Sequence, residues 1–196
     1  LIVPHIDYYR GGPCYAHGYK ELKESGAPGL CIVFGIDHNG FDDLFIATAK
    51  DFQTPLGILK TDIDFINELQ KYHSSDLLKN EYAHAVEHSI EFQAVFLRYL
   101  FPEQPDMKIV PVLCGSLHNF VNNQKDPAEV PEIKSFFSAL KKTIKSYGKK
   151  VFWIAGVDMS HVGLQFGAKL PLRKNDLPAI EREDRKLISF IEKNDS

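Results

Sequence analysis

Paired cysteines and long apolar segments are both missing from this chain of 196 residues. The three cysteines are odd in number and form no Cys-x-x-Cys pair, which argues against a disulfide framework and favours a reducing compartment. No apolar run is long enough to span a bilayer, and no charged-then-apolar signal segment opens the chain. We therefore expect a cytoplasmic protein that does not enter a membrane.

The chain also lacks an excess of either charge and the glycine motifs of several enzyme classes. Its formal net charge of −3 at pH 7 gives no reason to expect binding to nucleic acid or to an anionic membrane. It contains no Gly-rich phosphate loop of the Walker or dinucleotide type and no Gly-x-Ser-x-Gly nucleophile elbow. These absences argue against nucleotide-binding and serine-hydrolase templates.

The composition and length are those of one globular domain. Hydrophobic residues make up 44% and charged residues 25%, which is ordinary for a globular protein. The length suits a single domain over residues 1–196. The chain opens with Leu-Ile-Val and without Met, so we expect some terminal residues before Leu1 and after Ser196 to be missing from it.

Three continuous apolar runs predict the centre of the fold. They cover residues 30–35, 108–114 and 151–157, and such runs are typical of strands buried on both faces of a parallel sheet. Pro111 indicates an edge or a bulge in the second run. Shorter strands are expected at 1–5, 44–50 and 56–61, and helices at 13–25, 62–72, 87–101, 131–147 and 179–192. Alternating strands and helices predict an α/β fold, with a mainly parallel central sheet and helices on both faces.

Histidine is unusually frequent, with eight in the chain, and several follow predicted strands. His5, His38, His118 and His161 each come after a strand, beside another polar residue. In open α/β sheets ligands bind outside the C-terminal ends of the strands, and imidazole is the commonest metal ligand. Any one of these histidines is equally well explained by a hydrogen bond to local backbone, but four at one sheet edge predict a metal site.

A second polar group lies at the start of the predicted helix 87–101. His84, Glu87, His88 and Glu91 are spaced i, i+3, i+4 and i+7, so they would share one helix face. A solvated charged face is one interpretation. The same residues also match His-x-x-Glu-His, the inverted zinc-peptidase signature with two histidine ligands and a glutamate base, although so short a pattern is weak in a histidine-rich chain.

Five segments together resemble a known family. The Glu-His-Ser-Ile-Glu block is the most specific, and the resemblance covers nearly the whole chain. The segments are Pro4-His5-Ile6-Asp7, Gly35-Ile36-Asp37-His38, Glu87-His88-Ser89-Ile90-Glu91, Pro111-Val112-Leu113-Cys114-Gly115 and Asp158-Met159-Ser160-His161-Val162-Gly163. Their order and approximate spacing are similar to those of the Memo-like family, of the AmmeMemoRadiSam system protein B type. The resemblance implies a fold similar to class III extradiol dioxygenases, which are non-haem iron enzymes that open catechol rings.

The resemblance also implies a site. His5 and His38 match the two metal histidines, and His88 matches a further active-site histidine that acts as acid or base. Glu87 lies beside it and is a second catalytic candidate. The expected metal is iron, with copper and zinc as alternatives.

The third metal ligand is where this chain departs from the pattern. Ser160 stands where the dioxygenases have a glutamate and some Memo proteins a cysteine. A neutral serine is a poor ligand for iron or copper. Asp158, His161 or water are the substitutes that we expect in its place, and His161 is also a catalytic candidate.

Three functions follow as hypotheses. The leading one is redox or dioxygenase-like chemistry at a metal held by His5 and His38, with His88 moving a proton. The alternatives are metal-dependent hydrolysis, at this site or by His84 and His88, and a non-catalytic module that binds a peptide or partner on an enzyme-like fold. The substrate would be a small molecule or a protein, and the resemblance suggests a radical SAM protein and an AMMECR1-like protein as partners.

Overall fold

The computed structural model describes residues 1–26 and 28–193. The chain forms two compact units, Leu1–Val157 (unit 1) and Asp158–Ser196 (unit 2). The single domain over residues 1–196 stays a prediction. Within the described part of the chain, no helix is both long enough and apolar enough to cross a membrane.

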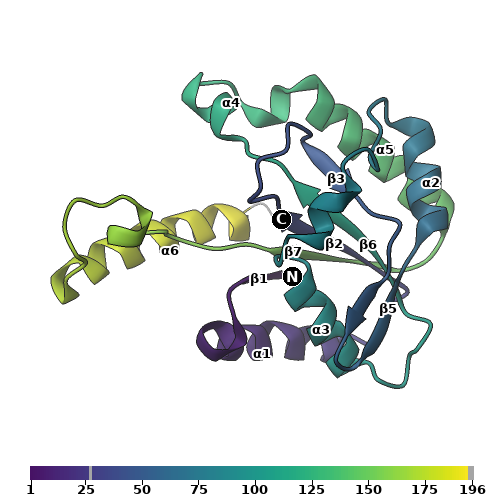
Figure 1. The fold of residues 1–196 in the computed structure, drawn as a ribbon, viewed down its shortest axis with the longest axis horizontal. Helices are drawn as coiled ribbons and strands as arrows, with labels where there is room; N and C mark the ends of the chain where they lie inside the picture. The colour runs from purple at the N-terminus through teal and green to yellow at the C-terminus, as the bar shows by residue number, and fades with distance from the viewer. Residues whose placement is uncertain (27, 194–196) are drawn as a thin grey trace. The chain divides into compact units, whose positions relative to one another are not determined.

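Unit 1 is built around a mostly parallel sheet, which confirms the predicted fold class (Figure 1). The described strands are β1 (Ile2–Val3), β2 (Leu30–Ile36), β3 (Phe45–Ala47), β4 (Phe52–Thr54), β5 (Gly57–Thr61), β6 (Lys108–Cys114) and β7 (Val151–Gly156). Their order in the sheet is β1-β7-β2-β6-β5-β4, and β3 also pairs with β6. The pairs β1·β7, β7·β2, β2·β6 and β6·β5 are parallel, whereas β3·β6 and β4·β5 are antiparallel.

Helices cover both faces of this sheet (Figure 1). Those of unit 1 are α1 (Tyr8–Glu24), α2 (Ile63–Tyr72), α3 (Glu91–Leu100), α4 (His118–Asn122) and α5 (Pro131–Tyr147), with short 3-10 turns η1 (Glu81–Ala85) and η2 (Pro127–Glu129). Unit 2 contains α6 (Leu177–Lys193), η3 (Leu164–Phe166) and η4 (Lys174–Asp176). The face with α1 and α3 and the face with α2 and α5 each carry their own hydrophobic core.

The two cores follow from the alternation of side chains along a buried strand. In β2, Cys31 and Val33 face α1 and α3, whereas Leu30 and Ile32 face α2 and α5. All four side chains are fully buried, which explains why the strand is apolar without interruption. Burying one such side chain contributes about 1.5–3 kcal/mol, so both faces stabilise the sheet whose ends carry the site.

Two helices begin or end where the sequence predicts, because their caps are local. Asp62 accepts a hydrogen bond from the Phe65 N–H at 3.2 Å and starts α2. Gly148 ends α5 at a φ of 71°, a left-handed conformation that glycine adopts without strain. In contrast, α1 begins at Tyr8 rather than at residue 13, because the Asp7 carboxylate caps it by accepting from the Arg10 N–H.

The central strands match their predictions. The predicted strand 44–50 is shorter than expected, since β3 covers only Phe45–Ala47 and pairs with β6, and the predicted strand 56–61 forms a hairpin with β4. The polar stretch after β6 contains the short helix α4.

Pro111 lies in an interior strand, not at the edge or bulge that the sequence predicts. On one side Pro111 is paired with Val33 of β2. On the other side β5 pairs only with Lys108 and Ile109, and β3 begins pairing at Val112. Proline is tolerated because its missing N–H falls in the gap between these two partner strands.

Candidate metal centre

Three histidines from separate segments converge at the C-terminal edge of the sheet. His5 follows β1, His38 follows β2, and His88 lies in the turn between η1 and α3. Their ligand atoms all lie within 4.8 Å of one another. The His5 ring centroid is 5.0 Å from that of His38 and 5.7 Å from that of His88. We call these residues the histidine trio.

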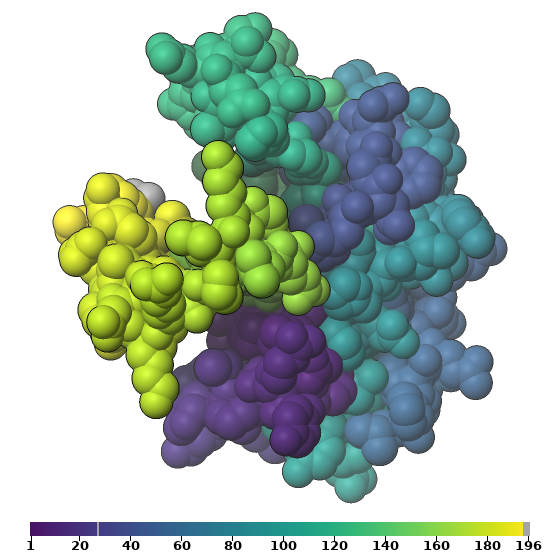
Figure 2. Space-filling view, turned by 60° about the vertical axis from the view of Figure 1, so that its left-hand side comes forward, coloured from purple at the N-terminus to yellow at the C-terminus, as the bar shows by residue number. Residues whose placement is uncertain are grey.

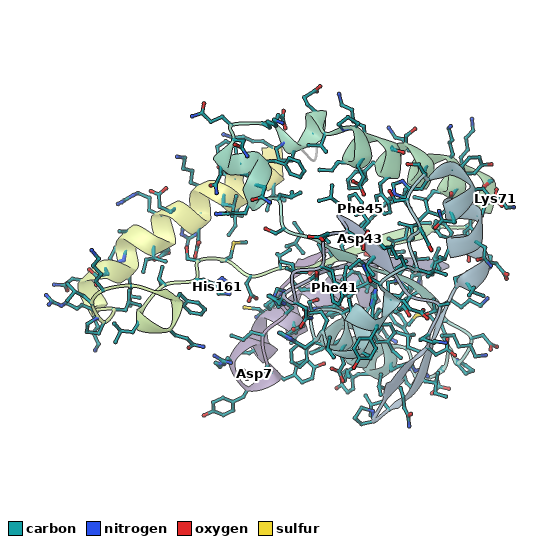
Figure 3. The ribbon with its side chains drawn as sticks, turned by 45° about the horizontal axis from the view of Figure 1, so that its top comes forward. Asp7, Phe41, Asp43, Phe45, Lys71 and His161 are labelled. Carbon is teal, nitrogen blue, oxygen red and sulfur yellow. The ribbon has the colours of Figure 1, made fainter. Side chains whose placement is uncertain are left out.

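Two segments of unit 1 continue the chain from this edge of the sheet, one after His5 and one after β2. The start of α1 (purple) and the loop after β2 (blue) are both visible on the face that Figure 2 shows. Asp37 shapes that loop, since its carboxylate accepts from the Asn39 N–H at 3.0 Å and the Phe41 N–H at 2.7 Å. Figure 3 shows Phe41 and Asp43 together on this loop. The Asp37 carboxylate therefore fixes the backbone on either side of His38.

His5 is the buried member of the trio, with 1% of its surface exposed. Its Nδ1 lies 3.0 Å from the Gly156 carbonyl oxygen at the end of β7. A carbonyl oxygen can only accept, so Nδ1 carries the proton and Nε2 keeps its lone pair. This tautomer is the one in which Nε2 can bind a metal.

Glu87 holds the other two histidines through a buried carboxylate. Its side chain is 2% exposed. Oε2 accepts from the His38 N–H at 2.9 Å and lies 3.0 Å from His38 Nδ1. Oε1 accepts from the N–H groups of His88 at 2.7 Å and Ser89 at 3.1 Å, and it lies 3.1 Å from His88 Nδ1.

These contacts keep Glu87 ionised. Burial by itself would raise the pKa of the carboxyl, but the backbone N–H groups of His38 and His88, the His38 ring and the Ser89 N–H lower it, and the net pKa lies below 4.5. An ionised carboxylate accepts the His38 Nδ1 proton and leaves Nε2 as the metal-binding nitrogen. A histidine whose second nitrogen bonds a carboxylate is the usual arrangement around metal ligands.

Ser89 ties the turn that carries His88 to the end of β2. Its hydroxyl donates to the Ile36 carbonyl at 3.0 Å and accepts from the Ile36 N–H at the same distance. The approach requires glycine at position 35, because a Cβ there would lie 2.5 Å from Ser89 Oγ and 2.6 Å from Ile90 Cγ1. His38 and His88 are thus held in register by a contact between β2 and the turn.

Gln93 ties the same turn to β1. The side chain is fully buried, and its Nε2 donates to the Pro4 carbonyl at 3.0 Å and the Ser89 carbonyl at 3.2 Å. Its Oε1 accepts from the Tyr19 hydroxyl at 2.8 Å. Through these bonds Gln93 fixes the backbone next to His5 against the turn that presents His88.

The predicted helix 87–101 begins later than expected, and the single face through His84, Glu87 and His88 does not form. The helix starts at Glu91, and His84 lies on η1 instead. The reason is the Glu87 carboxylate, which binds the His88 and Ser89 N–H groups and so favours a turn there. His84 Nε2 lies 2.9 Å from the Ile46 carbonyl, and His84 is not part of the histidine trio.

His118 is the strand-end histidine that the structure keeps out of the group. It is exposed and begins α4, after the connection 115–117. A histidine that follows a strand at some distance need not stay at the sheet edge, because the connection can carry it away.

The remaining predicted residues lie in unit 2. His161 Nε2 lies 3.3 Å from an Asp158 carboxylate oxygen, and the Ser160 hydroxyl donates to Asp184 on α6 at 2.6 Å. The structure thus pairs Asp158 with His161 and gives Ser160 a partner in its own unit. Their parts as metal ligands or as acid and base stay predictions.

The trio suits a metal ion such as iron, copper or zinc. Imidazole nitrogen binds all three, and the Nδ1 atoms of His5 and His38 already have fixed acceptors. Tetrahedral bonds of about 2.1 Å would separate ligand nitrogens by about 3.4 Å. The His38 and His88 side chains are 42% and 50% exposed, so small rotations of these two rings can close the difference from 4.8 Å.

Comparison with known proteins gives a family for this arrangement. The family described as Memo-like protein matches residues 1–196. The chain belongs to the Memo-like family. It is 32% identical over 167 residues to a MEMO1 family protein of Aquifex aeolicus, covering 85% of this chain and 40% of that protein.

Two further members of the family come from archaea. A MEMO1 family protein of Saccharolobus solfataricus is 34% identical over 164 residues, which cover 82% of this chain and 52% of that protein. Another from Saccharolobus islandicus is 32% identical over 185 residues, which cover 93% and 58%. The chain spans about half the length of these curated relatives. Membership in the Memo-like family agrees with the predicted likeness to the class III extradiol dioxygenase fold.

Sequence reasoning missed the residues that support the Memo-like site rather than form it. Ser89 and Gln93 had no predicted role, although a glutamine inside the apolar stripe of α3 signals a buried hydrogen-bonding group. Gly35 and Gly156 stand inside apolar strands, where glycine often marks a close approach of another segment. A Cβ at Gly156 would lie 2.9 Å from the Ser89 carbonyl oxygen.

Proposed function

We propose that this Memo-like chain holds an iron ion at the histidine trio and uses it for redox or oxygen-linked chemistry. One observation carries the proposal: three imidazoles converge within 4.8 Å, and two of them have Nδ1 bound to a fixed acceptor. Similarity to class III extradiol dioxygenases, implied by the family, favours iron over copper or zinc.

In this proposal His5 and His38 bind the metal through Nε2, and His88 moves a proton. His88 is the most exposed of the three, and its ring stacks on His38 with centroids 5.3 Å apart, so it can reach both the metal and a substrate. Bound iron would activate dioxygen or a substrate oxygen. His88 would take or give a proton through the ring nitrogen that faces away from Glu87.

Glu87 acts as a positioning residue in this scheme. Its carboxylate is buried and already accepts from the N–H groups of His38, His88 and Ser89. It is therefore placed to orient the two histidine rings rather than to contact a substrate. The hydrogen bonds of the Asp37 carboxylate and the Ser89 hydroxyl also hold the backbone on the β2 side of the site.

The first experiment measures metal content by elemental mass spectrometry on protein purified without a histidine tag. We expect about one iron per chain in wild type, in His118→Ala as the matched control, and in His88→Ala, but none in His5→Ala or His38→Ala. Dioxygen uptake with ascorbate as reductant should be present in wild type and lost in His88→Ala.

Other outcomes point elsewhere. Loss of metal in His88→Ala would make His88 a third ligand and contradict its proton-transfer role. Zinc, bound in wild type and released by His5→Ala, with esterase turnover, would favour metal-dependent hydrolysis at the same site. Zinc unaffected by His5→Ala would place the bound metal outside the histidine trio. No metal in any sample after reconstitution with iron, copper and zinc would contradict the metal centre and favour a partner-binding module. A radical SAM protein and an AMMECR1-like protein as partners remain proposals from the resemblance, and a cytoplasmic location remains a proposal from the cysteine usage.

A further inference from the structure

A pocket of about 430 Å³ lies beside the histidine trio, on the other side of Glu87. We call it the β4 pocket, because β4, η1 and the start of α3 line it. Glu87 borders both the pocket and the trio, and Glu91 follows His88 in the chain as the first residue of α3. This volume is within the range of small-molecule sites, and no role has so far been given to the pocket.

The charged side chains of the β4 pocket are mostly acidic. Asp51, Glu81, Glu87 and Glu91 line it, against the single ammonium group of Lys50. Glu87 is occupied by the histidines, but the other three carboxylates surround open space. An excess of negative charge in a concave site attracts cations and repels anions.

Hydrogen bonds among the described residues involve only one oxygen of the Glu81 carboxylate and one of the Asp51 carboxylate. Glu81 accepts from the Thr48 hydroxyl and the Ala49 N–H through Oε2, and Asp51 accepts from the Thr61 N–H through Oδ1. The second oxygen of each is not taken up by those bonds. Lys50 reaches Glu81 only at 4.0 Å and is 79% exposed, so it screens the pocket weakly.

Glu91 is the carboxylate best placed to receive a ligand. Within residues 1–26 and 28–193, no hydrogen bond or ion pair joins its side chain to another residue. It is exposed and lines the pocket from the first turn of α3. Among the side chains that line the pocket, Lys50 carries the single ammonium charge that would oppose a cation bound there, and the positive N-terminal end of α3 adds to that opposition.

His84 supplies a neutral polar wall. Its Nε2 lies against the Ile46 carbonyl, so Nε2 carries the proton and Nδ1 is an acceptor. That Nδ1 is buried and has no hydrogen-bond partner among the described residues. Burial lowers the pKa of His84 below 6.5, so at neutral pH the ring adds no positive charge that would repel a cation.

Two aromatic rings complete the pocket. Phe52 lies edge-on to the His84 ring at 6.2 Å between centroids, and Tyr82 is exposed at the rim. Aromatic faces attract ammonium groups and pack against the carbon chain that carries them. Carboxylates and two aromatic rings around one concave site are the chemistry that recognises an organic amine.

We propose that the β4 pocket binds a primary ammonium group of the substrate, with Glu91 as its principal carboxylate, and presents the rest of that molecule to the histidine trio. Presentation of the molecule to the histidine trio rests on the proposed metal centre. Binding of the ammonium group does not rest on it, because every residue that would contact the ammonium group lies outside the trio.

The test is a titration of the metal-free whole chain with phenethylammonium. Calorimetry measures the affinity, and amide chemical shifts in NMR spectra locate the binding site. The neutral 2-phenylethanol and the anionic 3-phenylpropionate serve as matched probes of the same shape. We expect the ammonium compound to bind most tightly, the alcohol weakly and the carboxylate not at all. Shifts should centre on Tyr82 and His84, and affinity should fall as salt is added.

Two substitutions change the charge of the pocket in opposite directions and should change the affinity in opposite directions. Glu91→Gln should weaken binding of phenethylammonium about fivefold, since an exposed charge pair contributes up to about 1 kcal/mol. Lys50→Gln should strengthen binding by a smaller factor, because the Lys50 side chain is 79% exposed. Glu103→Gln removes a carboxylate outside the pocket and should leave the affinity within about twofold of wild type.

Several results would overturn the proposal. Tighter binding of 3-phenylpropionate would show an anion site, and equal effects of Glu91→Gln and Glu103→Gln would show only a response to net charge. Repeating the titration in His5→Ala separates the two proposals. Both proposals together predict that His5→Ala binds the amine but takes up no metal. Amine binding by a wild-type protein that takes up no metal would contradict the metal centre alone, whereas metal uptake without amine binding in wild type would contradict the pocket alone.

Discussion

At the scale of single residues, Glu87 connects the stability of the fold with the geometry of the site. Its buried carboxylate accepts three backbone N–H bonds, from His38, His88 and Ser89, and these residues come from two distant segments. Hydrogen bonds to a charged acceptor contribute more than neutral ones, and a buried donor left without its partner is costly. One side chain therefore both fixes the loop after β2 and orients two histidine rings.

Glu87→Gln should lower the free energy of unfolding at pH 7 by about 2 kcal/mol, because the amide keeps the shape but loses the charge and one acceptor. Metal affinity should fall about 10- to 100-fold, as is usual when a carboxylate behind a ligating histidine is changed. Urea unfolding and metal titration measure the two effects. Glu103→Gln is the control, and a loss of metal binding without any loss of stability would contradict the shared role.

The stability part of this prediction depends on pH in a defined direction. The pKa of Glu87 is lowered on folding, so its stabilising effect is present above pH 4.5 and is lost as the pH falls through the lowered value. The difference in stability between wild type and Glu87→Gln should therefore be constant near neutrality and shrink below pH 4.5.

At the scale of elements, the turn before α3 is held against two strands, and glycine makes the contact with β2 possible. Gly35→Ala would place a Cβ 2.5 Å from Ser89 Oγ and 2.6 Å from Ile90 Cγ1. We expect a loss of about 1–3 kcal/mol in unfolding free energy, as for other overpacked sites, together with weaker metal binding. Gly12→Ala is the matched control.

The control substitution should behave in the opposite way. Gly12 lies in α1, and a Cβ there meets no atom within 4 Å. Alanine forms helices better than glycine, so Gly12→Ala should leave metal binding unchanged and raise stability by up to about 1 kcal/mol. If both alanine variants lost metal equally, the close contact at Gly35 would not be the cause.

The elements show which features local sequence can predict. The strands β2 and β6 and the helix α5 follow from apolar runs and local caps, so their limits are close to those predicted. The start of α3 is different, because Glu-His-Ser-Ile-Glu has helical spacing, whereas the Glu87 carboxylate favours a turn by bonding the His88 and Ser89 N–H groups and is itself held by distant His38. Contacts between segments far apart in the chain are invisible to a periodic pattern.

The same distinction explains the site. His5 and His38 could be predicted because the C-terminal ends of parallel strands lie at one edge of a sheet. The same rule predicted His118 at this edge, but His118 is the first residue of α4, because a short connection separates it from β6. Gln93 could not be assigned from sequence, since its role consists of bonds to Pro4 and Tyr19, both distant in the chain.

At the scale of the whole molecule, candidate ligands are divided between the two units. His5, His38 and His88 belong to unit 1, whereas Asp158 and Ser160 belong to unit 2. In the proposed metal centre His5 and His38 are the protein ligands, and water can fill the remaining positions. We therefore expect the triple variant Asp158→Asn/Ser160→Ala/His161→Ala to keep about one metal per chain.

Elemental analysis of the full-length triple variant checks this prediction, with circular dichroism to verify that the chain is folded. Retention of metal together with loss of dioxygen uptake would assign the unit 2 residues to the reaction instead of to metal binding. Release of the metal from a folded variant would instead show that unit 2 supplies a ligand, as the resemblance implies for position 160.

The buried carboxylate of Glu87 also gives the site an internal reporter that needs no ligand. The amide protons of His38, His88 and Ser89 all end on this one group, so none can exchange with deuterium until the turn opens. Although they lie about fifty positions apart in the chain, these protons should exchange at one common rate, set by a single local opening event. That rate is a measure of how often the histidines separate in solution.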